Sequence, residues 1–461
     1  MLQLYLFRLC HFYDLFSEPE TGGTDLMANA RQIAFEALCK VFKDSSYSNI
    51  TLDAYLSSSD LDTRDKSFVS ALFYGVIERQ LTLDYNLSLY LSKPLKKLKP
   101  EVLTIMRMGT YQILYMEKVP SSAAVNESIK LSKKNSAQFA SGLINAVLRK
   151  ISTNGLCLPN NTNSADYLSV KYSCSKWLTE KWIEEYGIDN TEAFLNSSLG
   201  ASDIYVRVNT TLTDANNLIS SLNNDGVEAE KTTLENALRI RFSGNDAEKL
   251  QSFKDGLFHV QDLACQLSVK ALRIKERDTV FDLCSAPGGK AFTAAQYAGK
   301  AGNVLAFDIY EKRAGLIRKG AERLKLTNIK ALTGDASVFN SELGQADKVL
   351  CDVPCSGFGI IGKKPEIKYK SEAEAKEIEK LQYPILKNGA KYVKKGGYLL
   401  YSTCTLSKAE NEEVCIRFLN EHRNFVSLKP LPEFSDETFL TLMPHKHGTD
   451  GFFIALFERK K

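Results

Sequence analysis

From about residue 258 to its end, the chain alternates short apolar runs with longer segments of helical periodicity. Helical repeats occupy Lys312–Leu324 and Glu372–Val393, and a last apolar run lies at Phe452–Phe457. The other runs, each with the length and composition of a buried strand, are Thr279–Leu283, Val304–Asp308, Ile329–Leu332, Lys348–Cys351 and Tyr398–Ser402. Strands separated by helices pair in parallel, because each helical crossover returns the chain to the same end of the sheet. The pattern therefore predicts a doubly wound α/β domain over residues 251–461.

Two regions of different character precede this domain. Residues 27–151 carry apolar stripes at helical spacing, with prolines at the turns, and predict an all-α bundle. Residues 152–168 are rich in Asn, Ser and Thr and predict a linker. Residues 169–250 predict a small α+β module of the kind that presents a sheet to RNA, with helices at Trp177–Tyr186 and Ala215–Leu222 and strands at Ile204–Val208 and Ala237–Phe242.

Composition limits the class of protein. The chain has 461 residues, of which 44% are hydrophobic, with a net charge of +4, so it predicts a multidomain globular protein, and the charge alone does not argue for a nucleic-acid partner. Its ten cysteines form no CxxC pair or zinc-like cluster, so we expect no metal, reduced thiols and a cytoplasmic location. Residues 1–26 are too short and too charged for a membrane span, and we expect a disordered or spurious extension there and no membrane partner.

A turn of small residues follows the first expected strand of the α/β domain. This turn, Asp282–Lys290, lets a ligand approach the backbone at a helix N-terminus, but it lacks the patterns that bind nucleotide phosphates. Asp308 and Asp335 follow the next two strands, where a carboxylate suits ribose hydroxyls or an adenine amine. Either aspartate alone is most simply a helix cap. Together with the glycine turn, they predict a nucleoside-like cofactor at the carboxyl edge of the sheet.

Two cysteines follow the fourth and fifth expected strands. Cys355 lies in Asp352–Gly357 and Cys404 in Tyr401–Thr405. A single cysteine is by default a buried structural residue. Two of them at neighbouring strand ends, beside a cofactor site, favour catalysis instead.

Thiols at this edge suit methylation of cytosine C5, which is by itself a weak nucleophile. A thiolate that adds to C6 pushes electron density onto C5, and covalent catalysis divides one difficult step into easier ones. A protonated carboxyl, for which we expect Asp352, would assist at N3 of the base. The base itself would have to leave its stack or lie in a loop. Methyltransferases that act on amines usually carry Asn/Asp-Pro-Pro-aromatic at the fourth strand, and Asp352-Val353-Pro354-Cys355 differs from it.

The motifs resemble the Nol/Nop/Sun family of RNA cytosine-C5 methyltransferases, and the helical region resembles NusB. The resemblance covers residues 28–461. The first likeness is carried by Asp282–Lys290, Asp352–Gly357, Ser402–Thr405 with Asn411-Glu412-Glu413, and Asp450-Gly451-Phe452-Phe453. The second is carried by Asp65, Tyr74-Gly75, Leu83-Asp84, Arg107, Gly109–Gln112, Val125–Glu127 and Gly142–Arg149. The combination implies a NusB-like bundle, a small α+β module and a Rossmann-like α/β methyltransferase domain.

The resemblance also implies roles for individual residues. Cys404 would be the nucleophile, Cys355 would assist product release, Asp352 would contact the cytosine and Lys290 would lie in the active site. The cofactor S-adenosylmethionine would be held by Cys284, Ser285, Ala286, Pro287, Gly288, Gly289, Lys290, Asp308, Arg313, Asp335 and Asp352. Gln261-Asp262 matches a family motif before the first strand. Phe358 and Ile360 stand where relatives often have small or polar residues.

The substrate follows from the resemblance and not from spacing. The implied partner is 16S ribosomal RNA of the small-subunit precursor, bound by a monomer. Three alternatives remain: the same chemistry on transfer RNA, a non-catalytic NusB-like RNA-binding or antitermination factor, and a small-molecule methyltransferase. Of two basic runs, Lys93, Lys96, Lys97 and Lys99 predict a solvated face. The second run follows the Pro-Cys turn and predicts RNA contact, at Lys363, Lys364, Lys368 and Lys370.

Overall fold

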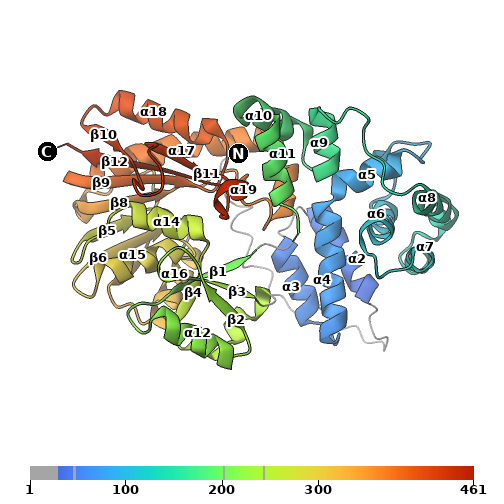
Figure 1. The fold of residues 1–461 in the computed structure, drawn as a ribbon, viewed down its shortest axis with the longest axis horizontal. Helices are drawn as coiled ribbons and strands as arrows, with labels where there is room; N and C mark the ends of the chain where they lie inside the picture. Colours follow the sequence, from blue (N-terminus) through green and yellow to red (C-terminus); the bar gives the residue numbers. More distant parts are fainter. Residues whose placement is uncertain (1–29, 45–47, 201–202, 242–243, 461) are drawn as a thin grey trace. The chain divides into compact units, whose positions relative to one another are not determined.

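The computed structural model describes residues 30–44, 48–200, 203–241 and 244–460 (Figure 1). These residues form two compact units. The helical unit contains residues 30–200 together with residues 361–372, and the sheet unit contains residues 203–360 and 373–460. The helical unit is therefore built from two separate stretches of the chain. The extension expected at residues 1–26 lies outside the described residues.

The helical unit packs amphipathic helices around one apolar core, as their periodicity predicts. Val69, Leu72, Phe73 and Val76, which lie on one stripe of a helix, are all fully buried in this core. The helices are α2 (Ala30–Asp44), α3 (Ser48–Ser57), α4 (Thr63–Glu78), α5 (Gln80–Ser88), α6 (Pro100–Tyr115), α7 (Ser121–Lys134), α8 (Ser141–Asn154), α9 (Ala165–Tyr172), α10 (Lys176–Tyr186) and α11 (Ile188–Ser197). Short 3-10 turns lie at η1 (Leu95–Lys97) and η2 (Gln138–Ala140).

The module expected at residues 169–250 is divided between the two units. Helices α9, α10 and α11 belong to the helical unit, and the strands that follow belong to the sheet unit. Hydrogen bonds join α9 to α5, from the Thr82 hydroxyl to Val170 O at 2.5 Å and from Leu81 N to Ser173 Oγ at 2.7 Å. The linker expected at residues 152–168 is shorter in the structure. It consists of residues 155–164, which lie between the end of α8 and the start of α9 and form neither helix nor strand.

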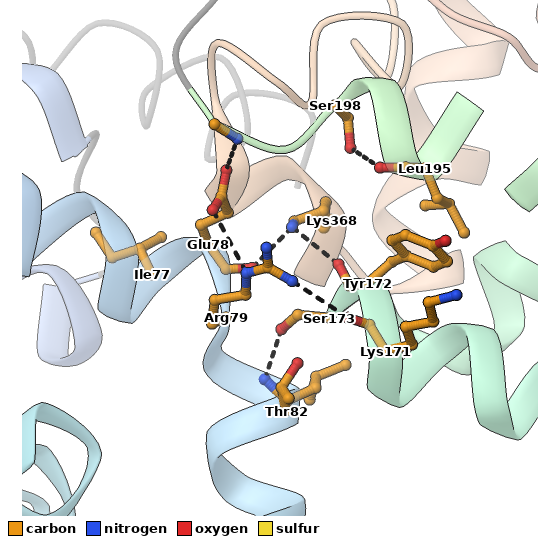
Figure 2. Close-up of polar contacts among 12 residues, drawn as sticks. Ile77, Glu78, Arg79, Thr82, Lys171, Tyr172, Ser173, Leu195, Ser198 and Lys368 are labelled. Atoms are coloured by element: carbon orange, nitrogen blue, oxygen red, sulfur yellow. Dashed lines mark hydrogen bonds and ion pairs between the residues drawn. The ribbon is translucent and has the colours of Figure 1, made fainter. Parts of the chain in front are cut away.

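The segment at residues 361–372 caps two helices of the helical unit. The lysine pattern predicts RNA contact for Lys368, and this prediction is wrong, because the side chain is fully buried. Its ammonium donates to Glu78 O at 2.8 Å and to Tyr172 O at 3.1 Å, the last residues of α4 and α9 (Figure 2). The last carbonyls of a helix have no partner within the helix and carry partial negative charge, which a cation satisfies.

Neighbouring residues of the same segment add further bonds to the helical unit. The segment includes the 3-10 turn η5 (Pro365–Tyr369). The Tyr369 hydroxyl donates to Ile77 O at 2.6 Å, and the Trp177 indole donates to Lys370 O at 2.9 Å. Burial lowers the pKa of Lys368 to about 8, because removing the ammonium from water disfavours its charged form. The two helix-end carbonyls that accept its hydrogen bonds offset part of this cost.

Lys368→Met is expected to destabilise the helical unit by about 2 kcal/mol. The substitution keeps the length of the side chain but leaves two buried helix-end carbonyls without their charged donor, at a cost of about 1–3 kcal/mol. Thermal unfolding of the whole chain measures the change, with Lys363→Met as the control because Lys363 is exposed in the same segment. Equal stability of the two variants would contradict the capping role.

The sheet unit begins with a small antiparallel sheet of order β2-β3-β1-β4. It contains β1 (Ile204–Val208), α12 (Ala215–Asn224), β2 (Glu228–Lys231), β3 (Ala237–Arg241), η3 (Gly244–Lys249), α13 (Gln251–Lys254) and β4 (Phe258–Val260). Two of these strands and α12 match the elements expected from the sequence. The buried Asn209 amide joins this sheet to the rest of the unit by donating to Gly256 O and to Leu324 O, each at 2.8 Å.

The large sheet has the order β10-β12-β9-β8-β5-β6-β7, with β11 paired to β12. Helices α14, α15 and α16 cover one face, and α17 and α18 cover the other (Figure 1). The elements are α14 (Leu263–Ala271), β5 (Thr279–Asp282), α15 (Gly289–Ala298), β6 (Asn303–Asp308), α16 (Glu311–Arg323), β7 (Ile329–Thr333), η4 (Ser341–Leu343), β8 (Ala346–Asp352), α17 (Glu372–Tyr392), β9 (Val393–Thr403), η6 (Lys408–Glu410), α18 (Glu412–Glu421), β10 (Phe425–Leu428), β11 (Phe439–Leu442), α19 (Pro444–His447) and β12 (Phe452–Arg459).

The sheet is mixed and not wholly parallel. Strands β5 to β9 pair in parallel as predicted, but β12 pairs antiparallel with β9, β10 and β11. The apolar run at Phe452–Phe457 predicts a buried strand but contains no information about its direction. The strand order reverses between β5 and β8, and ligands of such sheets bind at the carboxyl ends beside this reversal.

Within the described residues, no helix combines the length and apolarity needed to cross a membrane, and no cluster of His, Cys, Asp and Glu has the arrangement of a metal site.

Candidate active site

The glycine turn between β5 and α15 forms one wall of the site. Gly288 has a φ of +114°, a conformation that side chains rarely adopt, and a Cβ there would lie 2.4 Å from the Phe292 ring. Only glycine therefore fits this position, and the exposed backbone of the turn can approach a ligand closely. Burial, reinforced by the charge of Asp352, raises the pKa of Asp282 below the turn to about 7.

Asp308 ends β6 next to this turn, as the sequence predicts. Its carboxylate is 4% exposed and accepts from Tyr310 N at 3.1 Å. One nitrogen of Arg313 lies 3.3 Å from Asp308 Oδ2 and donates to Ala286 O at 3.1 Å. Burial raises the pKa of Asp308, although the charge of Arg313 opposes this effect. Arg313 thus holds the turn and the strand end together, two of the expected cofactor-binding elements.

Asp335 follows β7 and is exposed. Its carboxylate accepts from Ser337 N at 2.8 Å and from the Ser337 hydroxyl at 2.7 Å, and so it stabilises its own loop. Its position at a strand end agrees with cofactor binding, and its hydrogen bonds to Ser337 agree with a capping role. The sequence leaves both interpretations open.

The two cysteines meet at the carboxyl ends of β8 and β9. Cys355 Sγ and Cys404 Sγ lie 3.3 Å apart, which confirms that both cysteines face the same site. The hydrogen bond to Cys404, together with burial, raises the pKa of Cys355 well above that of an ordinary thiol. Either sulfur can be the donor in this contact, and the raised pKa of Cys355 favours the arrangement in which Cys355 keeps its proton and donates to the Cys404 sulfur.

Lys290 and Asp352 form an ion pair beside the cysteines. Lys290 Nζ lies 2.6 Å from Asp352 Oδ2, and the Ser402 hydroxyl donates to Asp352 Oδ1 at 2.8 Å. Burial is the largest single effect on Lys290 and lowers its pKa, but the charge and hydrogen bond of Asp352, together with Cys265 and Cys404, raise the pKa overall. Both oxygens of Asp352 therefore accept from donors in this structure, one from Lys290 and the other from Ser402. Lys290 also interacts electrostatically with Cys404, and a nearby cation favours a thiolate.

A third loop closes against the two cysteine turns. Gly359 N donates to Cys404 O, and Gly451 N donates to Gly359 O, each at 2.9 Å. A Cβ on Gly359 would lie 1.9 Å from Gly451 O, so the backbones touch where side chains are absent. The Asp-Gly-Phe-Phe motif is therefore part of the site. Phe358, expected to influence the pocket, is buried behind the turn, and Ile360 is partly buried.

Other residues of the site were not expected from the sequence. The thiol of Cys265 on α14 accepts from Lys290 Nζ at 3.3 Å. Glu410 and its hydrogen-bond partners lie behind the two cysteine turns. The motif Gln261-Asp262, noted from the sequence, precedes α14, and its Asp262 caps this helix by accepting from Ala264 N at 2.8 Å. Its neighbour Gln261 lies under the backbone of Gly289. Cys265 and Glu410 reach the site through contacts between distant segments, and no local sequence pattern identifies them.

Comparison with known families gives three matches along the chain. A model of the 16S rRNA methyltransferase RsmB/F matches residues 269–458, the NusB family matches residues 28–153, and an RsmF/B-like ferredoxin-like domain matches residues 174–245. A protein of Bacillus subtilis (strain 168), named probable ribosomal RNA small subunit methyltransferase B, is 36% identical over 449 residues. The match covers 94% of this chain and 99% of that protein.

The chain belongs to the ribosomal RNA small subunit methyltransferase B family. A member of this family from Proteus mirabilis (strain HI4320) is 28% identical and covers 94% of the chain and 99% of its own length. Membership confirms the family expected from the motifs and the NusB-like nature of the helical region. It also identifies the chain as a methyltransferase whose methyl donor is S-adenosylmethionine.

Two solved structures share the fold of this chain. The crystal structure of PH0851 is 28% identical, with a TM-score of 0.79, and covers 95% of this chain and 100% of that one. The structure of NSun6 from Pyrococcus horikoshii with SFG is 21% identical, with a TM-score of 0.55, and covers 61% of this chain and 97% of that one. The second likeness shows the fold alone.

Proposed function

We propose that this methyltransferase adds a methyl group to C5 of a cytosine in 16S ribosomal RNA, through a transient bond between Cys404 Sγ and C6 of the base. The observation that carries the proposal is the pair of thiols 3.3 Å apart, next to the Lys290–Asp352 ion pair, at the carboxyl edge of the sheet. A methyltransferase that acts on an amine has no use for such a pair. The ribosomal substrate is inferred from the names of the relatives, which are small subunit methyltransferases.

The residues at the ends of β5 and β6 fit S-adenosylmethionine. The cradle at Gly288 leaves no room for a side chain, and the Asp308 carboxylate is placed at a strand end where ribose hydroxyls can donate to it. We propose that the turn at residues 284–290, with Asp308, Arg313, Asp335 and Asp352, holds the cofactor. When bound, S-adenosylmethionine supplies an electrophilic methyl group on a sulfonium ion.

The first step is attack by Cys404. Its sulfur, which carries no proton while Cys355 donates to it, forms a bond to C6, and the electron pair of the C5–C6 bond moves toward C5 and N3 of the base. The Lys290 ammonium stabilises the negative charge that develops on the ring. Asp352, which acts as an acceptor here, is suited to the exocyclic amine of cytosine. C5 then takes the methyl group.

The second step releases the product and is assigned to Cys355. The C5 proton must be removed so that the C6–S bond breaks and the thiolate of Cys404 is restored. While Cys404 is bound to C6 it carries no negative charge, so its contribution to the raised pKa of Cys355 is lost, whereas the contribution of burial remains. Cys355 can then release its proton to water, and the resulting thiolate takes the C5 proton as the C6–S bond breaks and the Cys404 thiolate leaves.

Transfer of labelled methyl groups tests the proposal. Unmodified 16S ribosomal RNA is incubated with the whole chain and labelled S-adenosylmethionine, and the product is digested to nucleosides. We expect the label in 5-methylcytidine. Label in transfer RNA instead would preserve the chemistry and overturn the substrate, and label on an exocyclic amine would overturn the chemistry.

We also propose that the protein acts in the cytoplasm, as a monomer, on the precursor of the small subunit.

A further inference from the structure

Glu410 lies at the end of the 3-10 turn η6, and its side chain is fully buried. Its carboxylate accepts hydrogen bonds from two other segments of the sheet unit. One oxygen accepts from Ser356 N at 2.8 Å and from Gln382 Nε2 at 2.8 Å, and the other accepts from the Ser356 hydroxyl at 2.5 Å. A buried carboxylate is costly unless such donors surround it, so this arrangement is specific to an acidic side chain.

The carboxylate also orients a chain of hydroxyl groups. Ser356 Oγ and Thr405 Oγ1 lie 2.6 Å apart. With the single hydroxyl proton of Ser356 pointing to Glu410, Ser356 Oγ accepts from the Thr405 hydroxyl, which also lies 3.4 Å from Glu410 Oε1. Ser356 directly follows Cys355, and Thr405 directly follows Cys404. The chain of bonds therefore joins the two cysteine turns at the residues next to the two sulfur atoms.

Neighbouring contacts hold Glu410 itself in place. The Tyr401 hydroxyl on β9 donates to Glu410 O at 2.5 Å. The next residue, Asn411, accepts from the Thr403 hydroxyl at 2.5 Å and donates to Thr405 O at 3.0 Å. The Thr-Cys turn is thus fixed from behind on both sides of Cys404, and Glu410 extends this support to the turn that carries Cys355.

We propose that Glu410 is a positioning residue of the two-cysteine site, whose carboxylate keeps the Cys355 and Cys404 sulfur atoms in contact through Ser356 and Thr405. The inference rests on the proposed function, because the two sulfur atoms must act in turn on one base. Glutamine cannot replace the carboxylate: it offers one acceptor oxygen, and its NH₂ group would face donors.

Oxidative cross-linking measures the distance between the sulfur atoms without RNA. With diamide as the oxidant, the Cys355 and Cys404 thiols lose two protons and two electrons and form a disulfide, while diamide is reduced to its hydrazine. Peptide mapping of the whole chain identifies the cross-link. We expect Glu410→Gln to slow its formation at least 10-fold relative to wild type. Glu377→Gln, the same change at an exposed position of the helix that carries Gln382, is expected to cross-link at the wild-type rate.

Methylation provides the second readout. Glu410→Gln is expected to lower kcat 10-fold or more while binding S-adenosylmethionine as wild type does, which a general loss of folding would not produce. Thr405→Val removes the hydroxyl link at nearly constant volume, is expected to slow cross-linking as well, and decides the question if Glu410→Gln does not fold. Wild-type cross-linking rates in folded Glu410→Gln or in Thr405→Val would overturn the inference. Absence of 5-methylcytidine from the wild-type enzyme would instead overturn the proposed function, whatever the cross-linking shows.

Discussion

Cys404→Ser is expected to lower the rate of methyl transfer by a factor on the order of 10⁴ or more. The change replaces one sulfur atom by oxygen and conserves the shape of the side chain. A hydroxyl at this position cannot supply an anion near neutral pH, because its proton is held far more strongly than that of a thiol. The Lys290 ammonium and the Cys355 S–H, which favour a thiolate on Cys404, do not overcome this difference.

Incorporation of labelled methyl groups into RNA measures the loss, and binding of S-adenosylmethionine by Cys404→Ser serves as the test of folding. Cys157→Ser is the matched control, because Cys157 lies in the helical unit, in the segment between α8 and α9. It is expected to keep wild-type activity. Retained activity in Cys404→Ser, with activity lost in Cys355→Ser, would show that the roles of the two cysteines are reversed.

Cys355→Ala is expected to accumulate a covalent complex between Cys404 and RNA. The variant keeps the nucleophile and the Lys290–Asp352 pair, so addition to C6 and methylation of C5 can proceed. It lacks the thiol that lies 3.3 Å from Cys404 Sγ, and therefore the group assigned to removing the C5 proton. Without that step the C6–S bond persists.

A denaturing gel reveals the complex as a protein band of slower migration that contains labelled RNA and disappears after nuclease treatment. The double variant Cys355→Ala/Cys404→Ser is the control and is expected to form no such band. Normal turnover by Cys355→Ala without any adduct would contradict the release role, and an adduct in the double variant would contradict the assignment of the nucleophile.

The elements of the α/β domain follow closely from the sequence because their signals are local. The run at Val304–Asp308 predicts β6 to within one residue, and Ile204–Val208 predicts β1 with no difference. Asp308, Cys355 and Cys404 stand at strand ends in the sequence. Since parallel strands share one carboxyl edge, these residues had to meet once the sheet was formed.

Contacts between distant segments were not predictable in this way. Lys368 looks like part of an exposed basic run, yet it caps helices that end 290 and 196 residues earlier in the chain. Glu410 stands beside a recognisable motif, but its partner Ser356 lies 54 residues away. The neighbouring residues of a charge run or of a single glutamate predict an exposed side chain. Whether the side chain is buried depends on which remote segment covers it, and the local sequence does not contain this information.

The sequence by itself determined the alternation of β5 to β9 with helices, the glycine turn, and the placing of two thiols and three carboxylates at strand ends, because periodicity and residue type act over short distances. The tertiary structure decided the antiparallel direction of β12, the discontinuous helical unit, the pairing of Lys290 with Asp352 and the hydrogen bonds of Glu410. These features depend on which segments pack together, and this is set by the burial of the whole core and not by any one stretch of the chain.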